Sequence, residues 1–180
     1  AFVNNDFPNA PLLDIQNVLI HVEDSVHYGL QEVEAKDEWN ALEVIGFGSV
    51  TYGPSYRPFY LPMFHELHCL MSIRKNIVDG GSYERNKGHA RHCFDYLRQW
   101  ILCQSDLTLE TGDFMKRNFT REKLGATHVC KDWNDIYVQT TNKWVDWVTF
   151  WAAESKRYGQ KINRNTEPLS NTSSSNTSSK

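Results

Sequence analysis

The chain contains the pattern His-x-x-His-Cys twice, as HELHC at 65–69 and as HARHC at 89–93. Chance repetition is improbable in a chain that has only seven histidines and four cysteines. On a helix, side chains three residues apart share one face with their β-carbons about 5–6 Å apart, so each pair of imidazoles can act on one ion. Imidazole is a good ligand for copper, zinc, iron and nickel. The sequence therefore predicts a metal site formed by His65, His68, His89 and His92.

The two histidine pairs can share one centre or form two. In a tight antiparallel hairpin of two helices we expect His65 and His89 to lie about 15–20 Å apart, which predicts two separate sites. The connection between the helices, residues 79–86, can span up to about 25 Å, so it can also bring the first turns of both helices to one place. The sequence permits both arrangements.

The cysteines add a second constraint. Cys69 and Cys93 each follow a histidine by one position, about 100° around the helix, so we expect them to point away from the metal and to form cross-links. Cys93 cannot pair with Cys103, because ten helical residues separate them by about 15 Å and a disulfide requires less than about 7 Å. Two pairings stay open, 69–93 with 103–130 and 69–103 with 93–130. Both tie His128, two residues before Cys130, towards the metal as a candidate fifth ligand.

Other catalytic patterns are absent from the sequence. It has no nucleophile elbow, glycine-rich phosphate loop, Cys-x-x-Cys zinc pair or haem-attachment motif. HELH at 65–68 is one residue shorter than the HExxH of metalloproteases. Arg91 and Asp95 flank the second histidine pair, and we expect them to orient its ligands. The aromatic loop 52–60 is either a substrate-facing wall or a packing loop.

Hydrophobic spacing predicts three helices. The two that carry the histidines cover about 63–78, with Pro62 at the start, and about 87–103. The third covers about 133–158, and its tryptophans recur at helical spacing, which we interpret as a core-facing stripe.

The strands are fewer and shorter. A β-branched run predicts a strand or hairpin within 18–30, and a second strand over 49–52 precedes an extended loop. The predicted fold class is mainly α (α+β), in which a helical core carries the two histidine helices and a small β element lies near the N-terminus.

Length and composition indicate one domain. Its 180 residues can bury a core unaided, and we place a single domain at 1–165. The Ser/Asn/Thr-rich tail, 166–180, has too few apolar residues to fold and is predicted to be disordered. The net charge is −3 and the basic residues are scattered, which argues against a nucleic-acid partner.

Three N-glycosylation patterns, at Asn118, Asn171 and Asn176, and an even number of cysteines favour the lumen of the secretory pathway or secretion. The sequence contains no apolar run long enough to span a membrane. It begins at Ala1 without a methionine, so we expect that a segment ahead of it, such as a membrane anchor, has been removed.

Three segments together resemble the UstYa-like oxidases of fungal secondary-metabolite clusters: HELHCL at 65–70, HARHCFDYLRQWILCQSD at 89–106 and HVCKDW at 128–133. The resemblance covers about residues 46–133, and spacing as well as flanking residues agree. The first 45 residues and the last helix match only loosely.

That resemblance implies an enzyme of the secretory pathway with one membrane-spanning helix ahead of its catalytic domain. It implies oxidative tailoring of peptides or other natural products by macrocyclisation, hydroxylation, desaturation or halogenation, with copper as the metal of at least some members. His65, His68, His89 and His92 match the paired motifs, and His128 matches the later histidine.

We therefore expect a copper-dependent oxidase with one or two copper ions, a small-molecule or peptide substrate, and dioxygen or peroxide as the oxidant. Homo- and hetero-oligomers are both compatible with the sequence. The alternative is a non-catalytic secreted module in which the histidines hold a structural zinc, which requires a closed, four-coordinate site.

Overall fold

The computed structural model describes residues 2, 4–11, 13–23, 25–79, 83–109, 115–116, 118 and 125–158. The predicted tail at 166–180 and the glycosylation candidates Asn171 and Asn176 lie outside these residues, whereas Asn118 is exposed. In chain order the elements are β1 (Asn17–Val22), α1 (Ala35–Asn40), β2 (Ser49–Tyr52), β3 (Arg57–Tyr60), α2 (Pro62–Val78), α3 (Tyr83–Gln104), β4 (Ala126–Lys131) and α4 (Trp133–Tyr158). The predicted class, mainly helical α+β, is confirmed.

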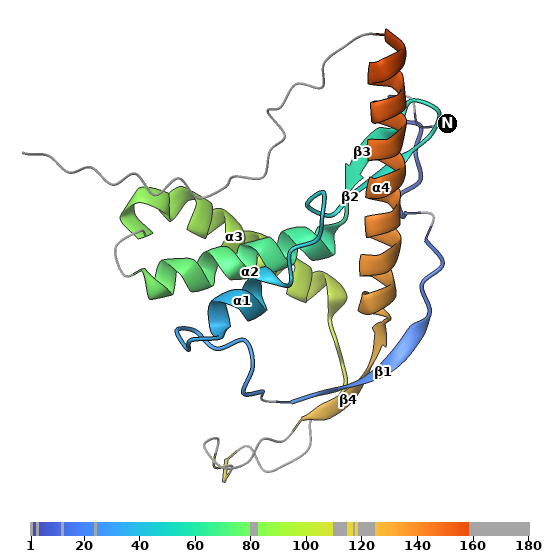
Figure 1. Cartoon of the computed structure of the whole chain (residues 1–180). Coiled ribbons are helices and arrows are strands. Elements are labelled where there is room, and N and C mark those ends of the chain that lie inside the picture. The colour runs from blue at the N-terminus through green and yellow to red at the C-terminus, as the bar shows by residue number, and fades with distance from the viewer. Residues whose placement is uncertain are drawn as a thin grey trace, which may run out of the picture.

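Helices α2 and α3 form an antiparallel hairpin, and α4 lies across its direction (Figure 1). The start of α2 follows from the sequence, because Leu61 is extended and Pro62 has its backbone angle preset for a first helical turn. Helix α2 ends at Asp79, whose N–H donates to the carbonyl of Lys75. Helix α3 begins at Tyr83, four residues before the predicted start, so the connection is shorter than the sequence suggested.

Two strands were missed by the sequence analysis. Strand β3 pairs with β2 inside the segment predicted to be an extended loop, and β4 pairs antiparallel with β1, about a hundred residues earlier. Gly125, the residue before β4, allows the strand to approach β1. A Cβ at this glycine would lie 1.6 Å from the carbonyl oxygen of Val22.

The main apolar core joins β2, the start of α2 and α4. Its centre is Val50 and Phe64, and Tyr137 of α4 packs its ring edge-on against Phe64 at 5.0 Å between centroids. Tyr137 also donates a hydrogen bond to the carbonyl of Leu42 at 2.7 Å. Gly48 (φ +75°) makes this packing possible, because a Cβ there would lie 2.4 Å from the Phe64 ring. The core therefore anchors α2 one residue before His65.

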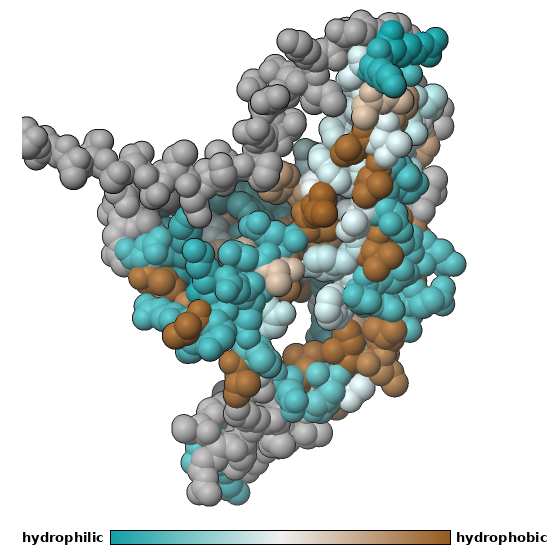
Figure 2. All heavy atoms as spheres, in the orientation of Figure 1, coloured by the Kyte–Doolittle hydropathy of each residue, from teal (hydrophilic) through white to brown (hydrophobic). Residues whose placement is uncertain are grey.

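Helix α4 has the predicted bounds, but the prediction that its aromatic stripe is core was wrong in part. Trp144 packs against Gly46, whereas Trp133 is 52% exposed and Trp151 is 44% exposed. Figure 2 shows hydrophobic side chains along α4 on the surface. Helical spacing tells which residues share a face, but not whether another element covers that face. In the part of the chain that the structure describes, no helix has the length and apolar character needed to cross a membrane.

Candidate metal centre

The four histidines of the two motifs lie together between α2 and α3. His65 and His92 face each other with their Nε2 atoms 3.4 Å apart and their ring centroids 5.4 Å apart. His68 and His89 form an equivalent pair with a centroid separation of 5.5 Å. Within each helix the two rings are 6.3 Å apart. The structure therefore brings all four predicted ligands into one cluster.

The convergence occurs in the antiparallel hairpin that we expected to separate the histidine pairs, so that part of the prediction was wrong. We compared His65 with His89, the first histidine of each motif. In an antiparallel hairpin the first histidine of one motif lies opposite the second of the other. Both cross-helix pairs have the same midpoint in the sequence, between Val78 and Asp79, as a single antiparallel register requires.

The cross-helix pairs also have the spacing that a single ion requires. A metal–nitrogen bond of about 2.1 Å places a ring centroid about 3.2 Å from the ion, so two imidazoles at a tetrahedral angle have centroids about 5.2 Å apart. The separations of 5.4 and 5.5 Å are close to this value, whereas 6.3 Å along one helix would need a nearly linear arrangement. In this structure the natural ligand pair therefore spans the two helices.

The cluster is open to solvent on one side. His68, His89 and His92 are exposed, and His65 is half-buried. Burial lowers the pKa of His65, and the three neighbouring imidazoles lower that pKa further by charge repulsion. A neutral imidazole keeps the nitrogen lone pair that a metal needs, so the environment of His65 favours its ligand form.

The two motif cysteines form the floor of the cluster. Cys69 and Cys93 have no exposed surface, and their thiols are in hydrogen-bonding contact. Burial, and then Cys93, raises the pKa of Cys69 to about 12. The ligand atoms of His65, Cys69 and His92 all lie within 4.8 Å of one another. The expectation that Cys69 points away from the metal was therefore wrong: it lies four residues after His65, on the same helix face.

The predicted disulfides are not confirmed, because all four cysteines are free thiols in the structure. Cys69 and Cys93 are neighbours, as one of the two pairings requires. Cys103 is exposed and Cys130 is half-buried.

His128 lies elsewhere. It is on β4, and its Nδ1 is 2.5 Å from a carboxylate oxygen of Asp106, just beyond the end of α3. The end of α3 at Gln104 is twelve residues after His92, or about 18 Å along the helix. The backbone N–H of Thr108, and after it His128, lower the pKa of Asp106 to about 2. The structure therefore does not bring His128 to the four histidines, and its ring is hydrogen-bonded to Asp106 instead.

Arg91 and Asp95 line an outer cavity beside His92. Asp95 accepts hydrogen bonds from Arg98 at 2.8 Å and from Gln99 at 2.9 Å. Among the described residues, no hydrogen bond joins Arg91 or Asp95 to an imidazole of the cluster. No contact therefore supports the expectation that these two residues orient the ligands.

Two residues that do touch the cluster were missed. Ser72 Oγ lies 3.2 Å from Nδ1 of His89, and the ring of Tyr96 lies 4.3 Å from that of His65. Each is four residues after the second histidine of its motif, which places it on the same helix face. That spacing is a signal in the sequence that could have identified both.

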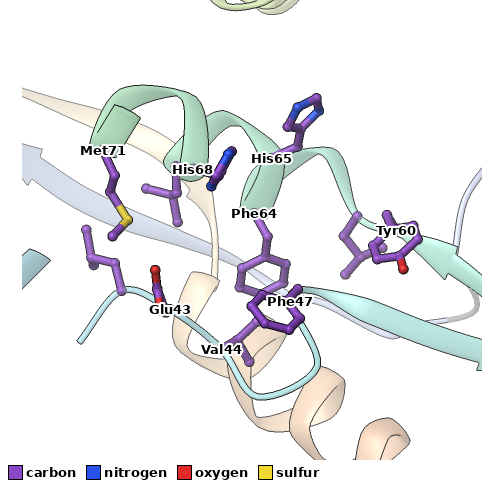
Figure 3. Close-up of a pocket in the computed structure, with 11 residues that line it drawn as sticks. Glu43, Val44, Phe47, Tyr60, Phe64, His65, His68 and Met71 are labelled. Atoms are coloured by element: carbon purple, nitrogen blue, oxygen red, sulfur yellow. The ribbon is translucent and has the colours of Figure 1, made fainter. Parts of the chain in front are cut away.

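A cavity of about 480 Å³ opens beside His65 and His68. Figure 3 shows it between α2 and the segment before β2, with Phe64, Phe47 and Val44 on its walls and the ring of His65 pointing away from Phe64. Phe47 and Tyr60, which are 74% and 69% exposed, also line it. Its lining is otherwise apolar: Leu42, Leu61, Leu67 and Met71 complete it. Of the aromatic loop predicted as a wall, only the end, Tyr60, lines this cavity.

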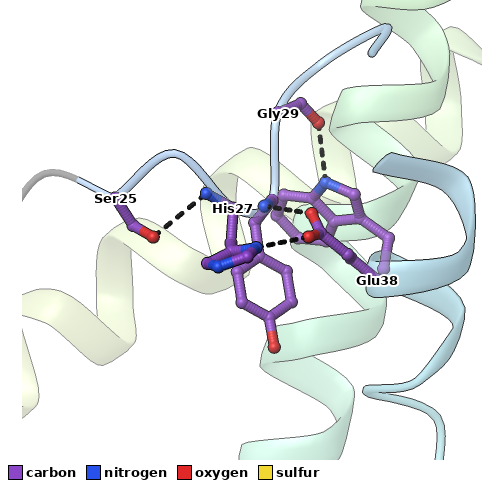
Figure 4. Close-up of polar contacts among 6 residues, drawn as sticks. Ser25, His27, Gly29 and Glu38 are labelled. Atoms are coloured by element: carbon purple, nitrogen blue, oxygen red, sulfur yellow. Dashed lines mark hydrogen bonds and ion pairs between the residues drawn. The ribbon is translucent and has the colours of Figure 1, made fainter. Parts of the chain in front are cut away.

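Another histidine, His27, has a structural role (Figure 4). Its Nδ1 is 2.6 Å from the Glu38 carboxylate, and this contact together with the Tyr28 N–H lowers the pKa of Glu38. Next to it, Trp39 of α1 and Arg74 of α2 both donate to the carbonyl of Gly29, at 2.9 and 3.3 Å. This region fastens the N-terminal segment to α2 outside the histidine cluster.

Residues 10–144 match the family described as "Mycotoxin biosynthesis protein UstYa". The chain belongs to the UstYa family. The matched residues include both His-x-x-His-Cys motifs, and the match extends through β1 and into α4, beyond the segment that the sequence resemblance covered.

Several curated proteins are similar to this UstYa-family chain. UstYa family oxidase phomYb of Diaporthe leptostromiformis is 40% identical over 82 residues, 44% of this chain and 33% of the relative. Oxidase ustYa of Aspergillus flavus is 34% identical over 42% of this chain and 37% of the relative. Hydroxylase cctR of Talaromyces islandicus is 33% identical over 43% of this chain and 31% of the relative. The matched part thus spans about a third of each relative, and no solved structure matches the chain significantly.

Proposed function

We propose that this chain carries the metal centre of a copper-dependent oxidase that tailors a fungal secondary metabolite. The observation that supports this most directly is the convergence of four imidazoles from two helices, with one cross-helix pair already at 3.4 Å between Nε2 atoms. Relatives that are named oxidases and a hydroxylase support an oxidation of C–H or O–H bonds.

The donor set fits copper. Imidazole suits both oxidation states of copper, and the exposed edge of His68, His89 and His92 leaves coordination positions open. A structural zinc site is closed by four protein ligands. The exposed edge of the cluster argues against such a closed site. When bound, copper would supply one-electron chemistry with dioxygen or peroxide.

The protein's own contribution is to hold ligands and substrate in place. Each cross-helix histidine pair would hold one ion. The apolar cavity, which His65 and His68 help to line, would bind an apolar part of the substrate. Phe47 and Tyr60 at the cavity would shield that part from water. Holding one substrate bond beside the metal ligands would lower the activation barrier through proximity and orientation.

The test is metal analysis of the purified chain after anaerobic copper loading, followed by electron paramagnetic resonance and oxygen-consumption measurements. Copper bound in preference to zinc, with a Cu(II) signal that shows nitrogen hyperfine coupling and disappears in a variant lacking all four histidines, supports the proposal. A zinc-loaded, diamagnetic protein that consumes no oxygen after copper loading would refute it and favour the structural-zinc alternative.

A further inference from the structure

The histidine cluster has a local pseudo-twofold symmetry. The two motifs exchange places across the hairpin, so that the pair His65–His92 corresponds to His89–His68. The centroid separations of 5.4 and 5.5 Å across the helices and of 6.3 Å along each helix agree with this. Positions that correspond in the two motifs therefore face equivalent histidines.

The symmetry is broken at the third position after each cysteine. On α2 this position is Ser72, whose Oγ lies 3.2 Å from Nδ1 of His89. On α3 it is Tyr96, whose ring lies 4.3 Å from that of His65 and 5.9 Å from that of His92. One half of the cluster thus has a hydrogen-bonding partner where the other half has an aromatic cover.

The hydroxyl has a chemical consequence for His89. An imidazole that binds a metal through Nε2 carries its proton on Nδ1, and that proton needs an acceptor. Ser72 Oγ is within reach to accept it, and Nε2 on the other side of the ring lies 3.7 Å from Sγ of Cys93, so these two contacts hold the ring with Nδ1 towards Ser72. Among the described residues, Nδ1 of His65, His68 and His92 has no hydrogen-bonding partner of this kind.

We propose that Ser72 is a positioning residue that holds His89 in its metal-binding form, and that the His68–His89 half of the cluster therefore binds its ion more tightly than the half covered by Tyr96. This inference rests on the proposed function, because it concerns the same four histidines. The inference goes beyond the proposed function because it assigns a role to a residue outside both motifs. It also predicts that the two halves of the cluster bind their ions with unequal affinity.

The test compares Ser72→Ala with Ser72→Thr, which keeps the hydroxyl, and with Thr149→Ala, which removes an exposed hydroxyl on α4. Copper(I) affinity is measured anaerobically by competition with a colorimetric chelator. The Ala variant is expected to lose about 10–100-fold in affinity for the tighter ion, as is typical when a partner of a ligating histidine is removed. The Thr variant and the Thr149→Ala control are expected to stay within about threefold of the unmodified chain.

A second measurement separates positioning from general damage. Nitrogen-15 NMR of the metal-free chain reports the tautomer of each neutral imidazole, and only His89 is expected to change its ratio of tautomers in Ser72→Ala. Should both affinity and tautomer match those of the unmodified chain, or should Ser72→Thr bind as weakly as Ser72→Ala, the inference is wrong while the proposed function stands. A chain that binds no copper at all would overturn both.

Discussion

The spacing of the four imidazoles predicts how many ions they hold, and paired substitutions can measure it. If each cross-helix pair holds one ion, His65 and His92 serve one ion while His68 and His89 serve the other. Replacing His65 and His92 together by alanine then removes one ion and leaves the second. Replacing His65 and His89 together damages both pairs, although the number of lost ligands is the same.

The geometry gives the expected size of the difference. Two imidazoles on one tetrahedral ion have centroids about 5.2 Å apart, and only the cross-helix separations of 5.4 and 5.5 Å approach this. We therefore expect two copper ions in the unmodified chain, one in the His65/His92 double variant and none in the His65/His89 double variant. The single variants His65→Ala and His92→Ala should each lose the same ion, so their effects are not additive.

The assay is the ratio of copper to protein after loading and removal of weakly bound metal, with Thr149→Ala as the control. A single ion held by all four histidines would make the two double variants indistinguishable. Equal stoichiometry in both would therefore refute the cross-helix assignment, as would an unmodified chain that never exceeds one copper.

Four further outcomes are expected. His128→Ala should leave the copper-to-protein ratio unchanged in the same metal analysis, because His128 is hydrogen-bonded to Asp106 beyond the end of α3. Leu67→Trp should narrow the 480 Å³ cavity and lower oxygen consumption with 4-methylphenol as the probe, at unchanged copper content. Gly48→Ala, which would put a Cβ 2.4 Å from the Phe64 ring at φ +75°, should lower the free energy of unfolding by about 2 kcal/mol in urea titrations. Because the pKa of His65 is lowered in the folded chain, the unfolded chain binds a proton there more readily. The free energy of unfolding of the metal-free chain should therefore fall as the pH drops below about 6.5, and it should fall less in His65→Gln. An equal fall in His65→Gln and in the unmodified chain would contradict the assignment to His65.

The sequence predicted well the features that depend on local periodicity. The helices that begin at Pro62 and at Trp133 have the predicted bounds within a residue. Helix spacing also identified the four histidines as one ligand set. These features follow from residues three and four apart, which a single segment of sequence contains.

Features that depend on distant partners were not predicted. Strand β4 has six residues and is paired only through β1, about a hundred residues away, so its own sequence carried little signal. The alignment of the two motifs depends on the register between the two helices, which the sequence of neither helix contains. The position of Cys69 could have been derived, since it follows His65 by four residues, but we measured its direction from His68 alone.

The same packing explains why the two sides of the cluster are held differently. His65 follows Phe64, which is buried in the core with Val50 and Tyr137, so the α2 ligands stand on the best-packed part of the molecule. Of the α3 side chains that the structure describes, only Ala90 and Cys93 are buried, and both face α2. An ion shared between His65 and His92 would thus connect a rigid helix to one with little apolar anchorage. Metal binding would then contribute to the folding of the hairpin as well as to its chemistry, because ligands from both helices must come together before an ion can bind.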